Sequence, residues 1–121
     1  MGKLGFKIKK SLLPFHMLFG RKHYRKAVKN LYAKTGAVIF AGDPKYIDRS
    51  AKLDVFGGGK IYIGDQTVIT QETIILVHDY SIDCGMVAAG LADPDNESIL
   101  VKDVHIGNNT FIGQRATILP G

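Results

Sequence analysis

Aliphatic residues recur at a spacing of six along the second half of the chain. The two runs are Ile63, Ile69 and Ile75, then Leu100, Ile106, Ile112 and Ile118. A glycine follows the aliphatic residue at Gly64, Gly107 and Gly113. Strands of an ordinary β-sandwich explain alternation between two faces, but they do not explain a period of six.

This spacing predicts that residues 43–121 form a left-handed parallel β-helix. In such a fold a short strand pairs with the coils above and below it, and three strands complete one turn. One aliphatic residue of each hexad then fills the interior, and glycine or another permissive residue takes the corner. The expected fold class is therefore all-β, a left-handed parallel β-helix of hexapeptide repeats with a basic N-terminal helical extension.

Charge divides the chain at the turn formed by Asp43 and Pro44. Residues 1–42 contain ten Lys or Arg and no acid, whereas residues 43–121 contain six Lys or Arg and eleven acids. We therefore expect a basic amphipathic helical arm at residues 1–42 and a β-helix domain at residues 43–121. Residues 79–99 interrupt the repeat and are rich in Gly, Ala, Asp and Pro, which predicts a loop excursion.

The basic arm allows three interpretations. Tyr24, Val28 and Leu31 lie on one face of a helix expected over residues 21–35. Upstream, apolar residues among lysines suit a segment that lies in a membrane interface, so peripheral membrane contact through residues 1–35 is one interpretation. The second is that the helix caps the β-domain while its lysines face water. Nucleic acid is the third, and we expect no such partner because no recognised binding module surrounds the arm tyrosines.

The single cysteine, Cys84, cannot close an internal disulfide, which favours a reducing compartment. No segment reaches the length of about 18 apolar residues that a membrane span needs. The short apolar run at residues 12–19 leads into basic residues and not into a signal cleavage site. The expected location is the cytoplasm, at the inner face of the membrane if the arm binds there.

Three segments resemble the hexapeptide-repeat acyltransferases. Residues 63–68 (IGDQTV) and 106–113 (IGNNTFIG) are similar to the repeats of that family. Residues 74–81 (IILVHDYS) resemble the segment that carries the catalytic histidine in sugar and polysaccharide O-acetyltransferases. The resemblance covers roughly residues 45–121.

The resemblance implies an acetyl-CoA-dependent O-acetyltransferase that acts on a hydroxyl of a sugar or surface polysaccharide precursor. His78 would be the general base, because a neutral imidazole can accept the hydroxyl proton. Asp79 and Tyr80 would contact the substrate within an acceptor pocket shaped by residues 79–99. Asp79 has two other interpretations, as a group that orients His78 and as a local cap of the turn.

The resemblance also implies a coenzyme site and an oligomer. The pantetheine arm of acetyl-CoA would pass Phe111, Gly113 and Gln114, between neighbouring subunits of a homotrimer. No metal site is expected, because His105 lacks the histidine five residues away that metal-binding relatives use.

A second function class stays open, namely a non-catalytic or truncated β-helix scaffold that is anchored by its basic arm. Members of the family continue through further hexads, whereas this sequence stops within the hexad that begins at Ile118. An open last coil would expose unpaired strand edges. We therefore expect a truncated form of a longer enzyme, which would be inactive if the coenzyme channel were incomplete.

Overall fold

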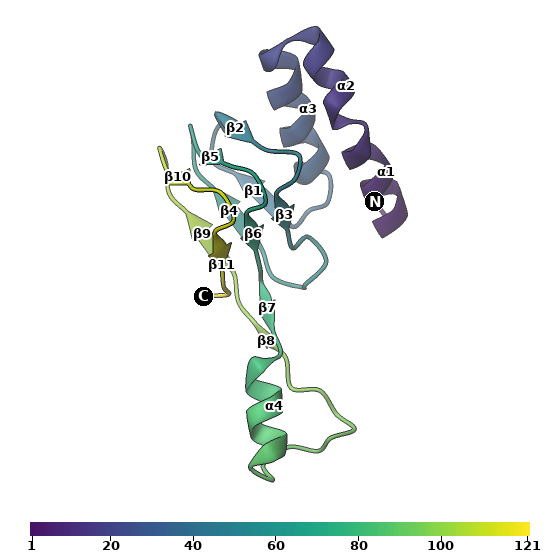
Figure 1. The fold of residues 1–121 in the computed structure, drawn as a ribbon, viewed down its shortest axis with the longest axis vertical. Coiled ribbons are helices and arrows are strands. Elements are labelled where there is room, and N and C mark those ends of the chain that lie inside the picture. The colour runs from purple at the N-terminus through teal and green to yellow at the C-terminus, as the bar shows by residue number, and fades with distance from the viewer.

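The computed structural model describes residues 1–121, and it shows a helical layer beside a body of short strands, with one projecting segment (Figure 1). The helices are α1 (Lys3–Ser11), α2 (Leu13–His16), the 3₁₀-helix η1 (Met17–Phe19), α3 (Arg21–Ala33) and α4 (Ser81–Ala88). None of these helices combines the length and the apolar character that crossing a membrane would require.

Eleven short strands follow the N-terminal helices. They are β1 (Val38–Phe40), β2 (Tyr46–Ile47), β3 (Lys52–Leu53), β4 (Ile61–Ile63), β5 (Val68–Ile69), β6 (Ile74–Ile75), β7 (His78–Asp79), β8 (Leu100–Val101), β9 (Val104–Ile106), β10 (Phe111–Ile112) and β11 (Thr117–Ile118). The projecting segment consists of β7, α4 and β8, and its two strands pair antiparallel.

The other strands form three parallel sheets of three strands each, in the orders β1-β4-β9, β2-β5-β10 and β3-β6-β11. In the second sheet Ile69 pairs with Ile47 on one side and with Ile112 on the other. In the third, Ile75 pairs with Leu53 and Ile118. Aliphatic residues that the sequence spaces by six therefore stand beside one another across the sheets.

The prediction of an all-β left-handed β-helix is wrong. The chain is a mixed α/β protein with four α-helices and with parallel sheets of only three strands, and no closed or solenoid β-helix is present. The physical reason is that the N-terminal helices belong to the core. Six of its 20 residues come from the first 33 positions, namely Phe6, Leu13, Tyr24, Val28, Leu31 and Tyr32.

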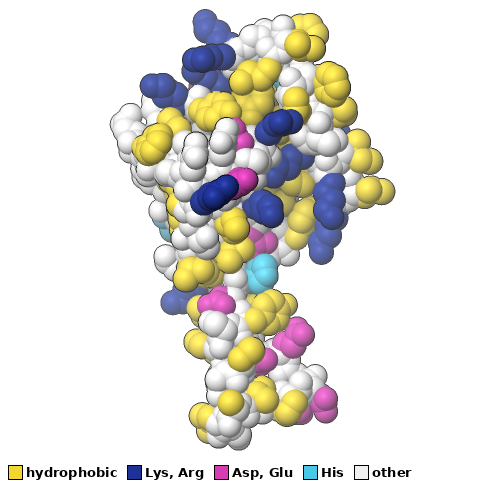
Figure 2. All heavy atoms as spheres, viewed as in Figure 1, with side chains coloured by type: hydrophobic (Ala, Val, Ile, Leu, Met, Phe, Trp, Pro, Cys, Tyr) yellow, Lys and Arg dark blue, Asp and Glu magenta, His cyan; other side chains and the backbone are white.

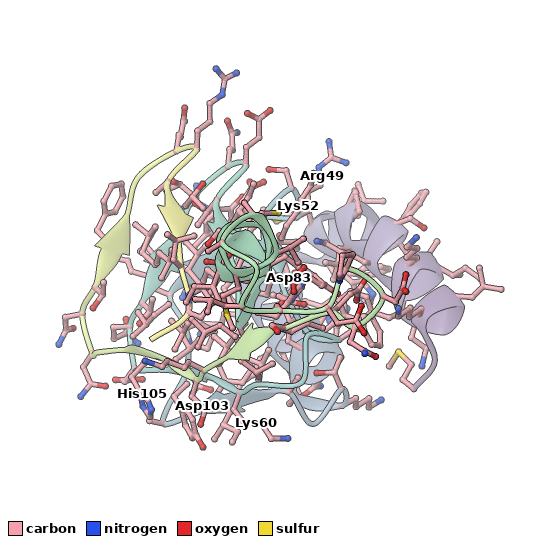
Figure 3. All side chains as sticks on the ribbon, turned by 90° about the horizontal axis from the view of Figure 1, so that it is seen from below. Arg49, Lys52, Lys60, Asp83, Asp103 and His105 are labelled. Atoms are coloured by element: carbon pink, nitrogen blue, oxygen red, sulfur yellow. The ribbon has the colours of Figure 1, made fainter.

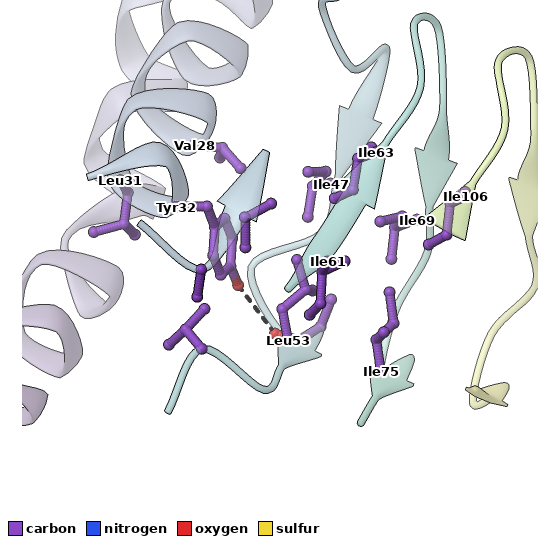
Figure 4. Packing of buried hydrophobic residues seen from close by; sticks show 14 of the residues in the cluster. Val28, Leu31, Tyr32, Ile47, Leu53, Ile61, Ile63, Ile69, Ile75 and Ile106 are labelled. Carbon is purple, nitrogen blue, oxygen red and sulfur yellow. Dashed lines mark hydrogen bonds between the residues drawn. The ribbon is translucent and has the colours of Figure 1, made fainter. Parts of the chain in front are cut away.

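Figure 4 shows how α3 packs against the strands through this shared core. Ile61, Ile69 and Ile75 are fully buried and lie on the inner side of the strands. The Tyr24 hydroxyl donates to the carbonyl oxygen of Ile47 at 2.8 Å, and burial raises the pKa of this hydroxyl well above its usual range. The helix thus caps the strands, as one interpretation of the arm expected. The boundary between residues 42 and 43 stays a prediction, and β1 lies before it.

The corners between strands use the left-handed backbone region at four residues other than glycine. These are Gln66, Glu72, Asn109 and Arg115, with φ between 53° and 61°. Beside two of these corners the buried hydroxyls of Thr67 and Thr73 donate to the carbonyl oxygens of Gly64 (2.8 Å) and Gly113 (3.3 Å). Each hydroxyl thus spends its proton on a backbone carbonyl oxygen at a corner and is itself satisfied despite its burial.

Asp48 is a buried carboxylate held by hydrogen bonds near α3. It accepts from the Tyr46 hydroxyl at 2.7 Å, from the Ser50 backbone N–H at 2.9 Å and from the Ser50 hydroxyl at 2.6 Å. Burial alone would raise the pKa of Asp48, but the bonds from Ser50 and Tyr46 outweigh burial and hold it below the ordinary value of 3.8. Burial and the bond to Asp48 raise the pKa of Tyr46 to about 12.

We expect Asp48 to make the fold sensitive to acid. A carboxyl with a lowered pKa in the folded state contributes stability above its unfolded pKa, and this stability is lost as the pH falls through the folded value. Between about pH 5 and about pH 2 the unfolding free energy should therefore fall more steeply for the wild type than for Asp48→Asn. Urea unfolding across this range measures the difference, with Asp95→Asn at an exposed position as the control. Equal slopes for the wild type and Asp48→Asn would contradict the assignment.

Candidate functional site

A histidine and an aspartate pair at the end of the strand body. His78 begins β7, and its Nδ1 makes a short contact with Oδ2 of Asp54, the residue after β3. β3 and β6 are neighbours in the third sheet. Asp54, directly after β3, therefore lies beside the residues that follow β6. The His78 side chain is 33% exposed and that of Asp54 only 11%. The pair therefore consists of a shielded carboxylate and an imidazole that reaches solvent.

Two further groups fix the pair. The backbone N–H of Val77 donates to the same Asp54 oxygen at 3.2 Å. The Tyr80 ring meets the His78 ring edge-on, with 5.7 Å between the centroids and an angle of 90° between the planes. The first contact holds the Asp54 carboxylate, and the second restricts the orientation of the imidazole.

The arrangement determines which nitrogen of His78 can react. A carboxylate only accepts hydrogen bonds, so Nδ1 carries the proton that it donates to Asp54. Nε2 then keeps its lone pair and can take a proton from a substrate hydroxyl. Aspartate, histidine and hydroxyl stand in this order in the general-base systems of many hydrolases and transferases.

Gly57 lies against the Asp54–His78 pair, and because it has no side chain the two side chains fit beside it. A Cβ atom at this position would lie 2.1 Å from Oδ2 of Asp54 and 2.5 Å from Nδ1 of His78. Real Cβ atoms do not approach other heavy atoms so closely, so any larger residue must displace one of the two side chains.

We therefore expect Gly57→Ala to lower the steady-state rate of a reaction that uses His78 as its base by up to about 100-fold. The substitution would misplace the base without removing it. The thermal unfolding midpoint should change little, since only side-chain ends must move. Gly107→Ala is the matched control, because a Cβ there meets only the Thr110 hydroxyl oxygen, at 3.8 Å. If both variants kept full activity, Gly57 would have no role in placing the pair.

Asp79 has a local role. Its carboxylate accepts from the backbone N–H of Ser81 at 2.8 Å and from the Ser81 hydroxyl at 2.7 Å, at the start of α4. These two bonds hold the pKa of Asp79 below its usual range. Asp54, and not Asp79, is the carboxylate that contacts Nδ1 of His78. Tyr80 lies against His78 and stays partly exposed, within reach of anything that binds there.

The predicted coenzyme residues lie in a different sheet from His78. Phe111 belongs to β10, which pairs with β5, and its side chain is 71% exposed. Gly113 and Gln114 follow at the next corner, and a Cβ at Gly113 would meet no other atom within 4 Å. Figure 1 shows β10 and β7 at opposite ends of the strand body. Within one chain the structure does not bring these residues to the Asp54–His78 pair.

The remaining histidines have other surroundings. The His105 ring stacks on the Tyr62 ring at 4.4 Å with an angle of 1° between the planes. In Figure 3 it lies near Asp103 and Lys60 at the outer edge of the body. His16 and His23 contact each other on the arm, with 2.8 Å between Nδ1 and Nε2. No group of three or more His, Cys, Asp or Glu is placed to hold a metal ion.

Neither Asp54 nor Gly57 was predicted from the sequence to belong to the site. The signal that could have found them is the register between β3 and β6, in which Leu53 pairs with Ile75. This register would have placed Asp54 close to the segment that leads into His78.

Comparison of the chain with protein-family models, with curated proteins and with solved structures gave no match.

Proposed function

We propose that the protein is an acetyl-CoA-dependent O-acetyltransferase that acts on a hydroxyl of a sugar or surface polysaccharide precursor, with His78 as its general base. The observation that supports this best is the contact between Nδ1 of His78 and the shielded carboxylate of Asp54. It leaves Nε2 free to accept a proton, on an imidazole that is one-third exposed. The resemblance of residues 74–81 to the catalytic segment of sugar O-acetyltransferases supports the same assignment.

The proposed reaction needs no covalent enzyme intermediate. Nε2 of His78 removes the proton of the acceptor hydroxyl while the hydroxyl oxygen attacks the thioester carbonyl of acetyl-CoA. The C–S bond then breaks, and the thiolate takes the proton back from the imidazolium. The products are an O-acetyl sugar and coenzyme A, and the enzyme returns to its first state. Asp54 stabilises the imidazolium through Nδ1 while the charge exists.

The acceptor is proposed to bind beside the pair, at the base of the projecting segment that His78 begins. Tyr80 is next to His78, and aromatic faces commonly pack against the apolar face of a sugar ring. Residues 79–99 contain five acids and no Lys or Arg, and carboxylates can accept hydrogen bonds from sugar hydroxyls. Figure 2 shows this acidic and partly apolar segment projecting below the body. The His78 side chain is 33% exposed, so a saccharide can reach it from solvent.

Acetyl-CoA is proposed to bind between subunits of a homotrimer. The exposed Phe111 offers an apolar surface for the pantetheine arm, with Gly113 leaving room beside it. Since Phe111 and His78 belong to different sheets of one chain, a neighbouring subunit would have to bring its Phe111 toward the pair. The solution mass tests this part of the proposal separately from the chemistry.

The proposal is tested by coupling two readouts on the wild-type protein. Thiol release from acetyl-CoA is followed with a panel of saccharides, and the products are analysed by mass spectrometry for an added acetyl ester. We expect one acetylated sugar for each thiol released. Thiol release without sugar acetylation would indicate hydrolysis only, and no thiol release from a folded oligomer would favour the scaffold function.

A further inference from the structure

The N-terminal helices expose a row of large apolar side chains. Leu18 and Phe19 are 81% and 76% exposed, which is unusual for residues of this type. The exposed members of the row are Met1, Leu4, Ile8, Leu12, Phe15, Met17, Leu18 and Phe19. Leu4, Ile8 and Leu12 are spaced by four residues, which places them on one side of the segment.

The opposite side of the same helices packs against the body. Phe6 and Leu13 are buried, and the Phe6 ring lies 5.6 Å from Tyr32 and 5.9 Å from Phe56 between centroids. The helices are therefore apolar on two sides, and folding uses only one of them. Within the row, the Phe19 ring lies 5.3 Å from the His23 ring between centroids, yet Phe19 stays 76% exposed, so the row is left largely uncovered by the chain.

Positive charge surrounds this row. Residues 1–42 contain ten Lys or Arg and no acid, and Lys29 with Asp43 is the only ion pair that the arm makes. Lys7 and Lys9 lie on α1 between members of the row. Beside α3, a depression of about 480 Å³ is lined by Lys22, Arg25, Lys26 and Lys29 together with one acid, Asp43, which pairs with Lys29. In Figure 2 the dark blue side chains gather over the helical end, together with yellow ones at its edge.

We propose that residues 1–35 dock on an anionic lipid bilayer. Leu18, Phe19 and their neighbours enter the boundary between head groups and acyl chains, while the Lys and Arg side chains contact lipid phosphates. A surface that is both apolar and strongly basic matches such a membrane. A second copy of the chain fits worse, since it would bring two sets of ten positive charges together.

The charge distribution along the molecule gives this docking an orientation. The projecting segment holds five acids, and it extends from the end of the body away from the helices (Figure 1). Repulsion from an anionic surface turns that segment outward while the arm is attracted. The Asp54–His78 pair would then face the aqueous side, at the base of the projecting segment.

Co-sedimentation with vesicles tests the docking. We expect the full chain to bind vesicles of phosphatidylcholine and phosphatidylglycerol, to bind pure phosphatidylcholine vesicles at least tenfold more weakly, and to release as salt is raised. The triple variant Phe15→Ser, Leu18→Ser, Phe19→Ser should lower the partition coefficient by about 100-fold or more. Lys7→Gln with Lys9→Gln should lower it by about 30-fold.

Matched variants outside the arm serve as controls. Ile82→Ser, Leu91→Ser and Leu119→Ser change exposed apolar residues elsewhere, and Lys45→Gln with Lys102→Gln removes two charges elsewhere. Both should bind as the wild type does, and circular dichroism confirms that each variant is folded. The proposal is overturned if the wild type binds both kinds of vesicle equally or neither, or if the arm variants bind as well as their controls. It is also overturned if the triple variant changes only the oligomer mass.

Discussion

Replacing His78 with alanine is expected to lower the rate of sugar-dependent thiol release from acetyl-CoA by roughly 10²- to 10⁴-fold, the usual contribution of a general base. The physical reason is that Nε2 of His78 is the proton acceptor that the pairing with Asp54 leaves free. The side chain is partly exposed and is not part of the apolar core, so its removal should leave the unfolding free energy almost unchanged. Steady-state rates with acetyl-CoA and a saccharide measure the effect.

His105→Ala is the matched control for this variant. His105 also lies in a strand and contacts an aromatic ring, but its neighbour is Tyr62 and it has no carboxylate partner. Its variant should keep close to the wild-type rate. A His78→Ala protein that is folded and as active as His105→Ala would show that His78 is not the base.

Ile69→Ala is expected to lower the unfolding free energy by about 2–5 kcal/mol, the range for a buried isoleucine truncated to alanine. Ile69 is fully buried on β5, the middle strand of its sheet, between Ile47 and Ile112. Removing its side chain leaves a cavity that the short paired strands on both sides cannot easily close. Urea unfolding monitored by circular dichroism measures the loss.

Val68→Ala provides the comparison within the same strand. Val68 points to the other face of β5 and is only partly buried, so its truncation should cost less than about 1 kcal/mol. If the two variants were equally destabilised, the residues spaced by six would not form the core of the strand body.

The sequence predicted local features of the fold better than its class. The helix expected from Tyr24, Val28 and Leu31 is confirmed as α3, because a helical apolar face is a local pattern that tertiary packing reinforced. The six-residue spacing marked the buried isoleucines of β4, β5 and β6. The all-β class was wrong because the arm was treated as an extension, whereas Phe6 and Leu13 pack into the same core as the strands.

For the candidate site, too, the sequence predicted only what neighbouring residues in the chain encode. His78 was found because its neighbours in the chain resemble a catalytic segment, which needs only local information. Asp54 lies 24 positions earlier, so its role depends on how β3 pairs with β6. A phase slip of four residues between Leu53 and Ile63 hides that register in the sequence. Gly57 lies within this slip, and only the folded chain brings it against the Asp54 and His78 side chains.

The most direct test of the central claim is a double-mutant cycle on sugar acetylation with the wild type, His78→Ala, Asp54→Asn and the double variant. Asp54 is proposed to act only by orienting and stabilising His78, so two residues that work as one unit should not have additive effects. We predict that Asp54→Asn is slow, and that the double variant is no slower than His78→Ala alone. Independent losses that multiply in the double variant, or an Asp54→Asn protein with the wild-type rate, would contradict the account.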